Sequence, residues 1–320
     1  LIVGAGHAAG QAAASLRQEK YEGKIIVLGD EPVLPYQRPP LSKAYLSGEQ
    51  EQEKLLLRAA AFYEKQNIEV KTSTSVTEIN PQNSTIRIDD REDLSYDNLL
   101  IATGSRVRKI NVSGSELNNI HYLRTIEDVD QIRSGMAKDK KLVIVGGGYI
   151  GLEVAAIATQ AGMNVRVLET EDRVLQRVTT PTMSNYYTLL HEKRGVRIHT
   201  KTRVIGFEGK SAVDRVICEN DAFDADLVIV GIGIIPNSEL AEKAGIACEN
   251  GITVDERCQT SIPRIYAAGD CTNHPNPLLN RRLRLESVPN AMEQARVCAA
   301  NMVGKDKIYS VSYTHLRAHE

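Results

Sequence analysis

Short apolar runs recur along the chain, and most of them end at a glycine. Seven such runs, at 1–3, 24–28, 96–101, 141–145, 164–168, 226–230 and 265–267, have the length and the Val, Ile and Leu content of buried parallel strands. Helical stretches follow the first and the fourth run, at about 8–20 and from 149 to Gly162. Strands that alternate with helices predict an α/β fold with parallel central sheets.

A further helix is predicted over 182–194, where Gly195 ends the helical pattern. Its larger apolar side chains, Tyr186, Leu189 and Leu190, are expected in the core rather than at a cofactor.

The first run leads into Gly4-Ala5-Gly6-His7-Ala8-Ala9, a glycine-rich turn before an Ala-rich helix. In this fingerprint the first glycine permits a tight turn and the second lets the backbone approach a pyrophosphate. The third position needs a small residue, and Ala9 meets that need. The helix N-terminus adds N–H groups and a positive dipole end. The next run ends at Gly29, before Asp30 and Glu31, and a carboxylate there can bind ribose hydroxyls.

The run at 141–145 is followed by a complete GxGxxG, Gly146-Gly147-Gly148-Tyr149-Ile150-Gly151. Glu169 follows about 20 residues after the glycines, as the fingerprint requires. One such turn alone also occurs as a packing solution, whereas two complete units in one chain predict two dinucleotide sites. Glu169 favours NAD over NADP, because a carboxylate accepts from the 2′-OH and repels a 2′-phosphate. Arg173 lies nearby but follows two acidic residues.

Three further strand ends carry small residues: Ala102-Thr103-Gly104, the stretch from Gly231 to Gly233, and Gly269-Asp270. Each taken singly is also typical of a buried strand with a glycine turn. The two fingerprints predict two interleaved Rossmann-like domains. The first domain would comprise 1–107 and 238–310, and the second would be inserted at 108–237.

Composition narrows the class of protein. The 320 residues include 39 Lys and Arg against 41 Asp and Glu, so the net charge of −2 gives no basic field for nucleic acid or a membrane surface. No apolar run is long enough for a transmembrane helix. The five cysteines are scattered without a Cys-x-x-Cys pair, so we expect reduced thiols in the cytoplasm and no metal site. Residue 1 is Leu, which leaves a leader upstream as an open question.

The segment 34–46, Leu-Pro-Tyr-Gln-Arg-Pro-Pro-Leu-Ser-Lys-Ala-Tyr-Leu, is the most distinctive in the chain. Its two consecutive prolines fix an extended backbone before a short helix that starts near Leu41. One interpretation is a solvated proline-rich loop. The other is a clamp for a pyrophosphate and a flavin edge, since Arg38 and Lys43 are both cations that neutralise phosphate.

Together these pieces resemble the FAD-dependent, NADH-using ferredoxin reductases of oxygenase systems, the putidaredoxin and rubredoxin reductase group. The resemblance runs in order from 4–9 through 35–46 (PYQRPPLSKAYL), 102–104, 146–153 (GGGYIGLE), 231–237 and 266–270 (YAAGD) to 286–295 (ESVPNAMEQA). The apoptosis-inducing-factor flavoproteins are similar in the second of these pieces.

The resemblance implies a role for each matching residue. The FAD set would be Gly4, Gly6, Ala8, Ala9, Asp30, Glu31, Arg38, Lys43, Val76, Ala102, Thr103, Gly104, Arg124, Gly269, Asp270, Ser287 and Val288. The NADH set would be Gly146, Gly147, Gly148, Tyr149, Ile150, Gly151, Glu153, Glu169 and Gly233. Lys43 and Glu153 would pair and position flavin and nicotinamide, without acid–base chemistry.

The implied activity is transfer of a hydride from NADH to FAD and of single electrons to a ferredoxin or rubredoxin-type iron–sulfur protein. Two alternatives stay open. One is a redox-responsive scaffold of the apoptosis-inducing-factor type, and the other is the NADH-oxidising part of a nitrite reductase. The resemblance also disfavours thiol chemistry at the flavin. Cysteine-dependent NADH oxidases and peroxidases of related fold place a single cysteine in the segment that corresponds to 36–46, and this segment contains none here.

The resemblance fails at the end of the chain. The family continues into a C-terminal domain that carries Trp residues and part of the partner surface, whereas this chain has no Trp and ends in an unmatched tail, 311–320. We expect a fragment that lacks that domain and a few leading residues, with a tail of cloning or assembly origin rather than a metal-binding tail built on its two histidines.

Overall fold

The computed structural model describes residues 1–310, and the predicted unmatched tail lies outside the described residues. The chain forms two compact units. Unit 1 contains 1–37, 56–106 and the chain from 236 onward, and unit 2 contains 38–55 and 107–235. The chain passes from one unit to the other within β8 (Ser105–Val107) and β17 (Ile234–Pro236), which pair with each other.

Unit 1 is built on a five-stranded sheet in which every neighbouring pair is parallel. The strand order is β19-β7-β1-β2-β3, with β1 (Ile2–Val3), β2 (Ile25–Leu28), β3 (Ile68–Lys71), β7 (Leu99–Ile101) and β19 (Ile265–Ala267). The four strands predicted from apolar runs are all present and fully buried, which is the pattern of a parallel sheet covered on both faces.

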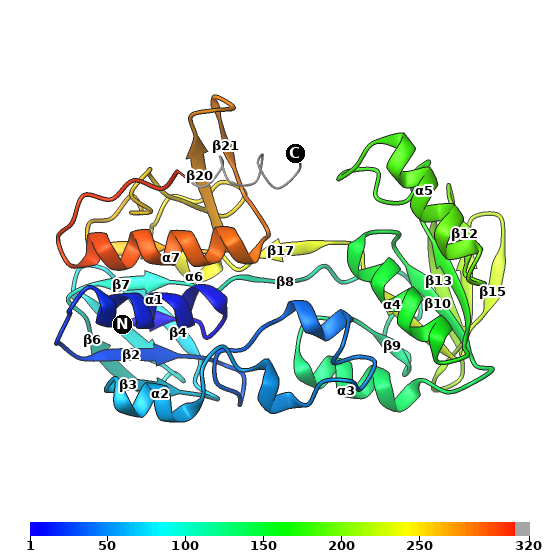
Figure 1. Ribbon diagram of the computed structural model, residues 1–320, viewed down its shortest axis with the longest axis horizontal. Helices are drawn as coiled ribbons and strands as arrows, with labels where there is room; N and C mark the ends of the chain where they lie inside the picture. The colour runs from blue at the N-terminus through cyan, green and yellow to red at the C-terminus, as the bar shows by residue number, and fades with distance from the viewer. Residues whose placement is uncertain (311–320) are drawn as a thin grey trace. The chain divides into compact units, whose positions relative to one another are not determined.

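Two long helices pack side by side on this sheet, α1 (His7–Gln18) and α7 (Val288–Met302) (Figure 1). Their contact is lined with small side chains, including the buried Ala8, Ala9, Ala295 and Ala299, which let the two backbones approach closely. The shorter helices of the unit are α2 (Ala60–Lys65) and α6 (Glu239–Lys243).

Two smaller sheets complete unit 1. One is the antiparallel meander of β4 (Val76–Asn80), β5 (Thr85–Ile88) and β6 (Glu92–Ser95). The other joins β18 (Ile252–Thr253), β20 (Thr272–Asn276) and β21 (Arg281–Leu283). Their inward side chains, such as Ile86 and Ile252, share a core with the central sheet.

Unit 2 repeats the arrangement. Its parallel sheet has the order β12-β11-β10-β16-β9, with β9 (Ile120–His121), β10 (Lys141–Val145), β11 (Asn164–Leu168), β12 (Arg197–His199) and β16 (Leu227–Val230). The helices are α3 (Ile126–Gly135), α4 (Tyr149–Gln160) and α5 (Pro181–Glu192), with the 3₁₀ turns η1 (Pro39–Ser42) and η2 (Gln52–Leu55). An antiparallel sheet of β13 (Val204–Gly209), β14 (Val213–Cys218) and β15 (Ala222–Asp224) closes the core. The α/β class with parallel central sheets is therefore confirmed.

The segment 38–55 packs with unit 2, although the sequence placed it with the first domain. Leu41, Tyr45 and Leu46 are buried there, and η1 contacts both α3 and α4. The Tyr45 hydroxyl donates to Asp130 Oδ1 at 2.9 Å, which fastens the segment to α3.

The predicted helix at 182–194 exists as α5, but its predicted buried face is wrong. Tyr186 and Leu189 are 56% and 57% exposed, whereas Ser184 is buried and Tyr187 packs against the Leu152 and Leu175 cluster. The Ser184 hydroxyl donates to the Val174 carbonyl at 2.7 Å and so fixes which side of α5 faces inward.

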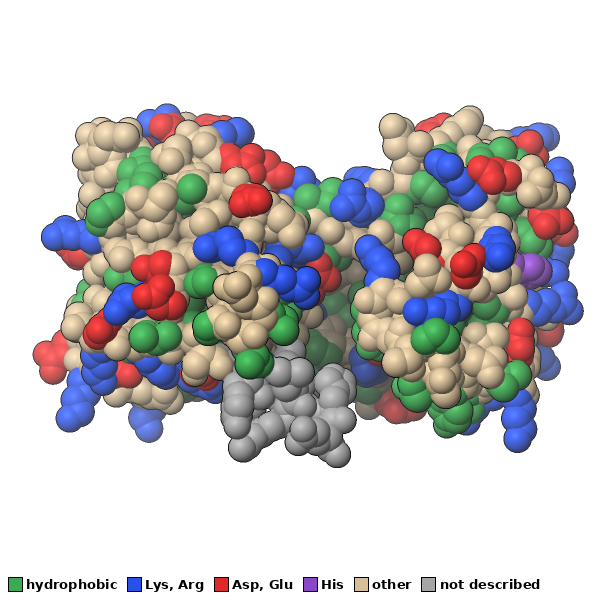
Figure 2. All heavy atoms as spheres, turned by 90° about the horizontal axis from the view of Figure 1, so that it is seen from above, with side chains coloured by type: hydrophobic (Ala, Val, Ile, Leu, Met, Phe, Trp, Pro, Cys, Tyr) green, Lys and Arg blue, Asp and Glu red, His purple; other side chains and the backbone are tan. Residues whose placement is uncertain are grey.

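Charged side chains of both signs are interspersed over each unit on the face seen in Figure 2. Among residues 1–310, no helix is long and apolar enough to span a membrane.

Candidate dinucleotide sites

The glycine turn of unit 1 lies at the carboxyl edge of its parallel sheet, where the ends of β1, β7 and β19 are neighbours. Gly4 has φ +110°, and a Cβ there would lie 2.2 Å from the Ala102 carbonyl oxygen. Only glycine allows this approach, so the first turn and the Ala102–Gly104 turn are in direct contact. Two of the predicted FAD segments are thereby brought together.

The N-terminus of α1 is open to a ligand. Its N-cap is Gly6, which offers no side-chain cap, and no atom lies within 4 Å of a Cβ built there. By contrast, α3, α5 and α7 are capped by the side chains of Thr125, Thr180 and Ser287. A glycine N-cap leaves amide donors without a side-chain acceptor, and a phosphate fits such a position. The residues present therefore fit the diphosphate of a dinucleotide.

The sequence does not decide which of the two carboxylates after β2, Asp30 or Glu31, would bind the ribose. Asp30 is exposed, whereas Glu31 is half-buried and its Oε2 accepts from the Tyr36 hydroxyl at 2.6 Å. Sequence reasoning missed Tyr36 as the partner of this carboxylate. The segment before Val76 lies against the same turn, because Thr74 N donates to the Gly29 carbonyl at 2.7 Å. Both candidate ribose carboxylates and Val76 are thus near one another.

The end of β19 adds Gly269 and Asp270. Gly269 has φ +90°, and a Cβ there would lie 3.4 Å from Ala8 of α1, so this turn also reaches the α1 N-terminus. Asp270 Oδ2 accepts from the Ser105 hydroxyl at 2.9 Å, a partner that the sequence did not indicate. Ser287 caps α7, and Val288 is the first residue of that helix.

Unit 2 carries the same turn in stricter form. Gly146 has φ +111° with its Cβ position 2.4 Å from the Gly231 carbonyl oxygen, and a Cβ on Gly151 would lie 2.2 Å from the Gly146 carbonyl oxygen. Gly148 caps α4 without a side chain and has no atom within 4 Å of a built Cβ. The N-terminus of α4 is therefore a second open anion position. Tyr149 and Ile150, which follow it, are 57% and 40% exposed.

Glu169 stands at the end of β11 and borders this turn. Its Oε2 accepts from Gly147 N at 2.7 Å, and its Oε1 accepts from Glu171 N at 2.9 Å. Arg173 is turned to other acceptors: its guanidinium donates to the Thr179 and Gln176 carbonyls and to the Ser184 hydroxyl at 3.0, 3.1 and 2.6 Å. Glu169, and not Arg173, therefore borders the turn.

A second cluster in unit 2 joins the proline-rich segment to α4. Lys43 Nζ lies 2.7 Å from Glu153 Oε2, and the Ser42 hydroxyl donates to the same oxygen at 2.5 Å. The Lys43–Glu153 pair expected from the resemblance is therefore formed. Ser42 was missed, because a serine in the motif carries no distinctive signal of its own.

The remaining predicted residues of unit 2 are Arg38, Arg124 and Gly233. Arg38 donates to the Arg124 carbonyl at 2.6 Å, so the two predicted cations are neighbours. Gly233 has φ +104°, and its carbonyl accepts from Arg108 N at 2.9 Å. Arg38, Lys43 and Arg124 lie in unit 2, whereas the other predicted FAD residues lie in unit 1.

The thiols are poorly suited to catalysis. All five cysteines are unpaired, and burial raises the pKa of the Cys218 and Cys248 thiols to about 11. Burial also raises the pKa of Cys271, so none of these three supplies a thiolate near neutral pH.

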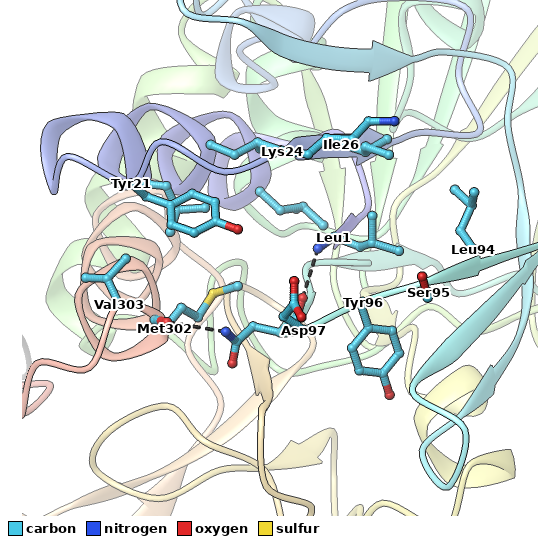
Figure 3. A pocket seen from close by; sticks show the side chains of 14 residues that line it. Leu1, Tyr21, Lys24, Ile26, Leu94, Ser95, Tyr96, Asp97, Met302 and Val303 are labelled. Atoms are coloured by element: carbon cyan, nitrogen blue, oxygen red, sulfur yellow. Dashed lines mark hydrogen bonds between the residues drawn. The ribbon is translucent and has the colours of Figure 1, made fainter.

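A cavity of about 250 Å³ lies at the opposite, amino-terminal edge of the unit 1 sheet. Figure 3 shows Tyr21, Leu94 and Met302 around it, with the Leu1 amine bonded to the Asn98 carbonyl at 2.9 Å. It contains none of the predicted site residues.

Comparison with known proteins places this chain among flavoprotein reductases of the family that the sequence motifs resemble. Residues 1–295 match the family described as pyridine nucleotide-disulphide oxidoreductase. The chain is 47% identical over 312 residues to putidaredoxin reductase of Pseudomonas putida, covering 95% of this chain and 74% of that protein. It is 39% identical over 306 residues to a rubredoxin-NAD(+) reductase of Pseudomonas putida, covering 95% of this chain and 80% of that protein.

Among solved structures, the covalent putidaredoxin reductase–putidaredoxin complex superimposes with a TM-score of 0.93 at 47% identity, covering 96% of this chain and 76% of that one. Because the family match covers residues 1–295 and the similarity to these relatives extends over 95% or more of the chain, the chain belongs to the pyridine nucleotide-disulphide oxidoreductase family.

Proposed function

We propose that the protein is an FAD-dependent reductase that oxidises NADH and passes single electrons to a ferredoxin or rubredoxin-type iron–sulfur protein. The observation that carries the proposal is the pair of open, glycine-capped helix N-termini, one in each unit, each beside a left-handed glycine turn. Two such positions suit two dinucleotides in one chain. The redox partners named for the putidaredoxin and rubredoxin reductases supply the class of acceptor.

In this proposal the turn at 4–9 with Ala102–Gly104, Gly269 and Asp270 holds FAD. The half-buried Glu31 is the better placed of the two carboxylates for its ribose, since the Tyr36 hydroxyl orients it. Arg38, Lys43 and Arg124 keep their assignment to FAD, together with Val76, Ser287 and Val288. The chemistry that FAD supplies when bound is acceptance of a hydride pair and release of single electrons.

The turn at 146–151 and Glu169 hold NADH. Because Glu169 borders Gly147 and Arg173 is bonded elsewhere, the site favours the 2′-hydroxyl of NADH over the 2′-phosphate of NADPH. Lys43 and Glu153 position the reacting rings, and neither is assigned a proton transfer. We also place the protein in the cytoplasm, where its five unpaired thiols stay reduced.

The first experiment is a visible spectrum of the purified protein followed by anaerobic titration with NADH. We expect flavin bands near ~450 nm that bleach on addition of NADH, and turnover with an added iron–sulfur protein. A colourless protein that takes up no FAD would refute the proposal. Slow reduction with a long-lived charge-transfer band and a change of oligomeric state would instead favour the scaffold alternative.

A second experiment tests the choice of nicotinamide. We expect Glu169→Ala to lower kcat/KM for NADH by about tenfold or more, the effect of losing a charged hydrogen bond. The preference for NADH over NADPH should shrink accordingly. An unchanged ratio would show that Glu169 does not read the ribose.

A further inference from the structure

A fully buried polar network lies behind the Gly269–Asp270 turn, on the side of α7. Its centre is Gln294, which has 0% exposure. Gln294 Oε1 accepts from Gly269 N at 2.8 Å and lies 2.9 Å from the Thr272 hydroxyl and 3.4 Å from Asn290 Nδ2. Gln294 is thus the side chain that holds the backbone of this turn.

The network also fixes the state of a histidine. Gly269 N can only donate, so Gln294 Oε1 must face it and Nε2 must face His274 Nδ1, at 3.4 Å. His274 Nδ1 is then an acceptor, and the ring hydrogen is on Nε2. His274 is also fully buried, with its ring edge-on to Tyr309 at 4.8 Å between centroids. The Tyr309 hydroxyl donates to Asn290 Oδ1 at 2.5 Å and closes the network.

The other side-chain bonds of this turn reach different atoms: the Thr272 hydroxyl donates to the Gly269 carbonyl oxygen at 2.8 Å, and the Ser105 hydroxyl donates to Asp270 Oδ2 at 2.9 Å. Gly269 at φ +90° lies between Ala8 of α1 and Ala291 of α7, whose methyl groups fill space but cannot bond an amide. Burying the Gly269 N–H without its acceptor would cost the desolvation of a polar group. The backbone that leads into Asp270 is therefore held in part by a residue of a different element, α7.

We propose that Gln294 is a positioning residue for FAD: it acts through Gly269 to set the Gly269–Asp270 turn against the N-terminus of α1. This inference rests on the proposed function. It assigns no contact between Gln294 and the cofactor, and it adds the middle of α7 to the support of a site that the N-terminus of this helix already borders.

The test compares Gln294→Met, which keeps the side-chain length but removes both polar groups, with Asn301→Leu. Asn301 is a second buried amide on α7, and it bonds the Arg257 and Lys307 carbonyls at 2.9 Å, away from the turn. Both apoproteins are prepared and their FAD dissociation constants measured well below their melting temperatures. Exchange of the Gly269 amide hydrogen is followed by mass spectrometry.

We expect Gln294→Met to weaken FAD binding by about tenfold or more and to speed exchange at Gly269, since a buried backbone donor loses its acceptor. Asn301→Leu should lower the melting temperature but leave both values near wild type. Gln294→Glu, which keeps an oxygen facing Gly269, should restore the slow exchange.

Equal FAD affinities for Gln294→Met and wild type, or equal losses in the two variants, would overturn the positioning role. Either result would leave the proposed function standing if the wild-type protein binds FAD. If the wild-type protein itself binds none, it is the proposed function that fails, and the Gly269 exchange rates still report whether Gln294 holds the turn.

Discussion

At the scale of single residues, the carboxylate Glu153 is contacted by two side chains of the segment 34–46. It receives the Lys43 ammonium and the Ser42 hydroxyl on one oxygen, and Lys43 and Glu153 keep 52% and 31% of their side chains exposed. An ion pair this exposed contributes little to stability, about 1 kcal/mol or less. The Lys43–Glu153 pair is therefore better explained as orienting the two charged side chains than as stabilising the fold.

We expect Lys43→Met to slow reduction of the flavin by NADH by at least about tenfold, because the variant loses a charge that orients Glu153 and stabilises negative charge on the reduced flavin. Stopped-flow absorbance measures the rate. The matched control is Lys141→Met, which removes a pair with Asp224 at 2.8 Å at the start of β10, whose side chains are 46% and 61% exposed. An identical rate and an identical flavin potential in Lys43→Met would contradict the assignment.

His274 is the residue with the clearest pH signature. Burial, and then the nearby Arg282, lower its pKa from 6.5 to about 4 in the folded protein. Between these values the unfolded chain binds a proton that the folded chain does not, so stability falls as the pH falls from 6.5 to 4. The full shift corresponds to about 3 kcal/mol.

We therefore expect the free energy of unfolding to decline over this pH window, and the decline to be smaller in His274→Gln. Urea denaturation at a series of pH values measures both slopes. Other histidines with lowered pKa, such as His121 and His191, are common to the two proteins and cancel in the comparison. Equal slopes would mean that His274 is not neutral in the fold.

At the scale of elements, two glycines of the turn before α4 serve different purposes: one is needed for the backbone conformation, and the other leaves room for a ligand. Gly146 needs a left-handed conformation and has no room for a Cβ, whereas Gly148 has φ −81° and open space around a built Cβ. The first glycine forms the turn, and the second keeps the α4 N-terminus uncovered.

We expect Gly146→Ala to lower the free energy of unfolding by about 2 kcal/mol or more through strain and the clash with Gly231. Gly148→Ala should lower it by less, about 1 kcal/mol or below, because alanine is a poorer N-cap than glycine, and should also weaken NADH binding, since its methyl group would lie over the helix amides. Chemical denaturation and NADH titration together separate the two effects. A Gly148→Ala protein that binds NADH normally would show that the cofactor does not use this helix end.

At the scale of the whole molecule, the chain enters unit 2 twice. The segment 38–55 joins unit 2 through the buried Leu41, Tyr45 and Leu46, while the residues on either side of it belong to unit 1. Segments that share buried apolar contacts and backbone hydrogen bonds unfold locally as one cooperative unit.

We expect amides of 38–55 to exchange hydrogen together with 107–235 as denaturant is added under native conditions, and not with the adjoining residues 24–37. Hydrogen exchange with mass spectrometry resolves these peptides. Exchange of 38–55 in step with 24–37 would contradict the division into units.

The sequence by itself determined seven strands of the two parallel sheets, the two glycine turns and the acids that follow them, whereas β3, β9 and β12 were not predicted. These features depend on local chemistry: apolar runs make buried strands, and only glycine fits a tight turn. The family resemblance followed from the same residues, and it also implied the Lys43–Glu153 pair.

Tertiary structure alone decided which face of α5 is buried, where the segment 38–55 packs, and which side chains support the turns. Tyr186 and Leu189 are apolar yet exposed, because the bonds of Ser184 set the rotation of their helix. Gln294, Ser42 and Tyr36 act on residues that are 25, 111 and 5 positions away in the chain. For Gln294 and Ser42 the physical reason is plain: a long-range hydrogen bond depends on how elements pack, and neither partner carries a local signal of it.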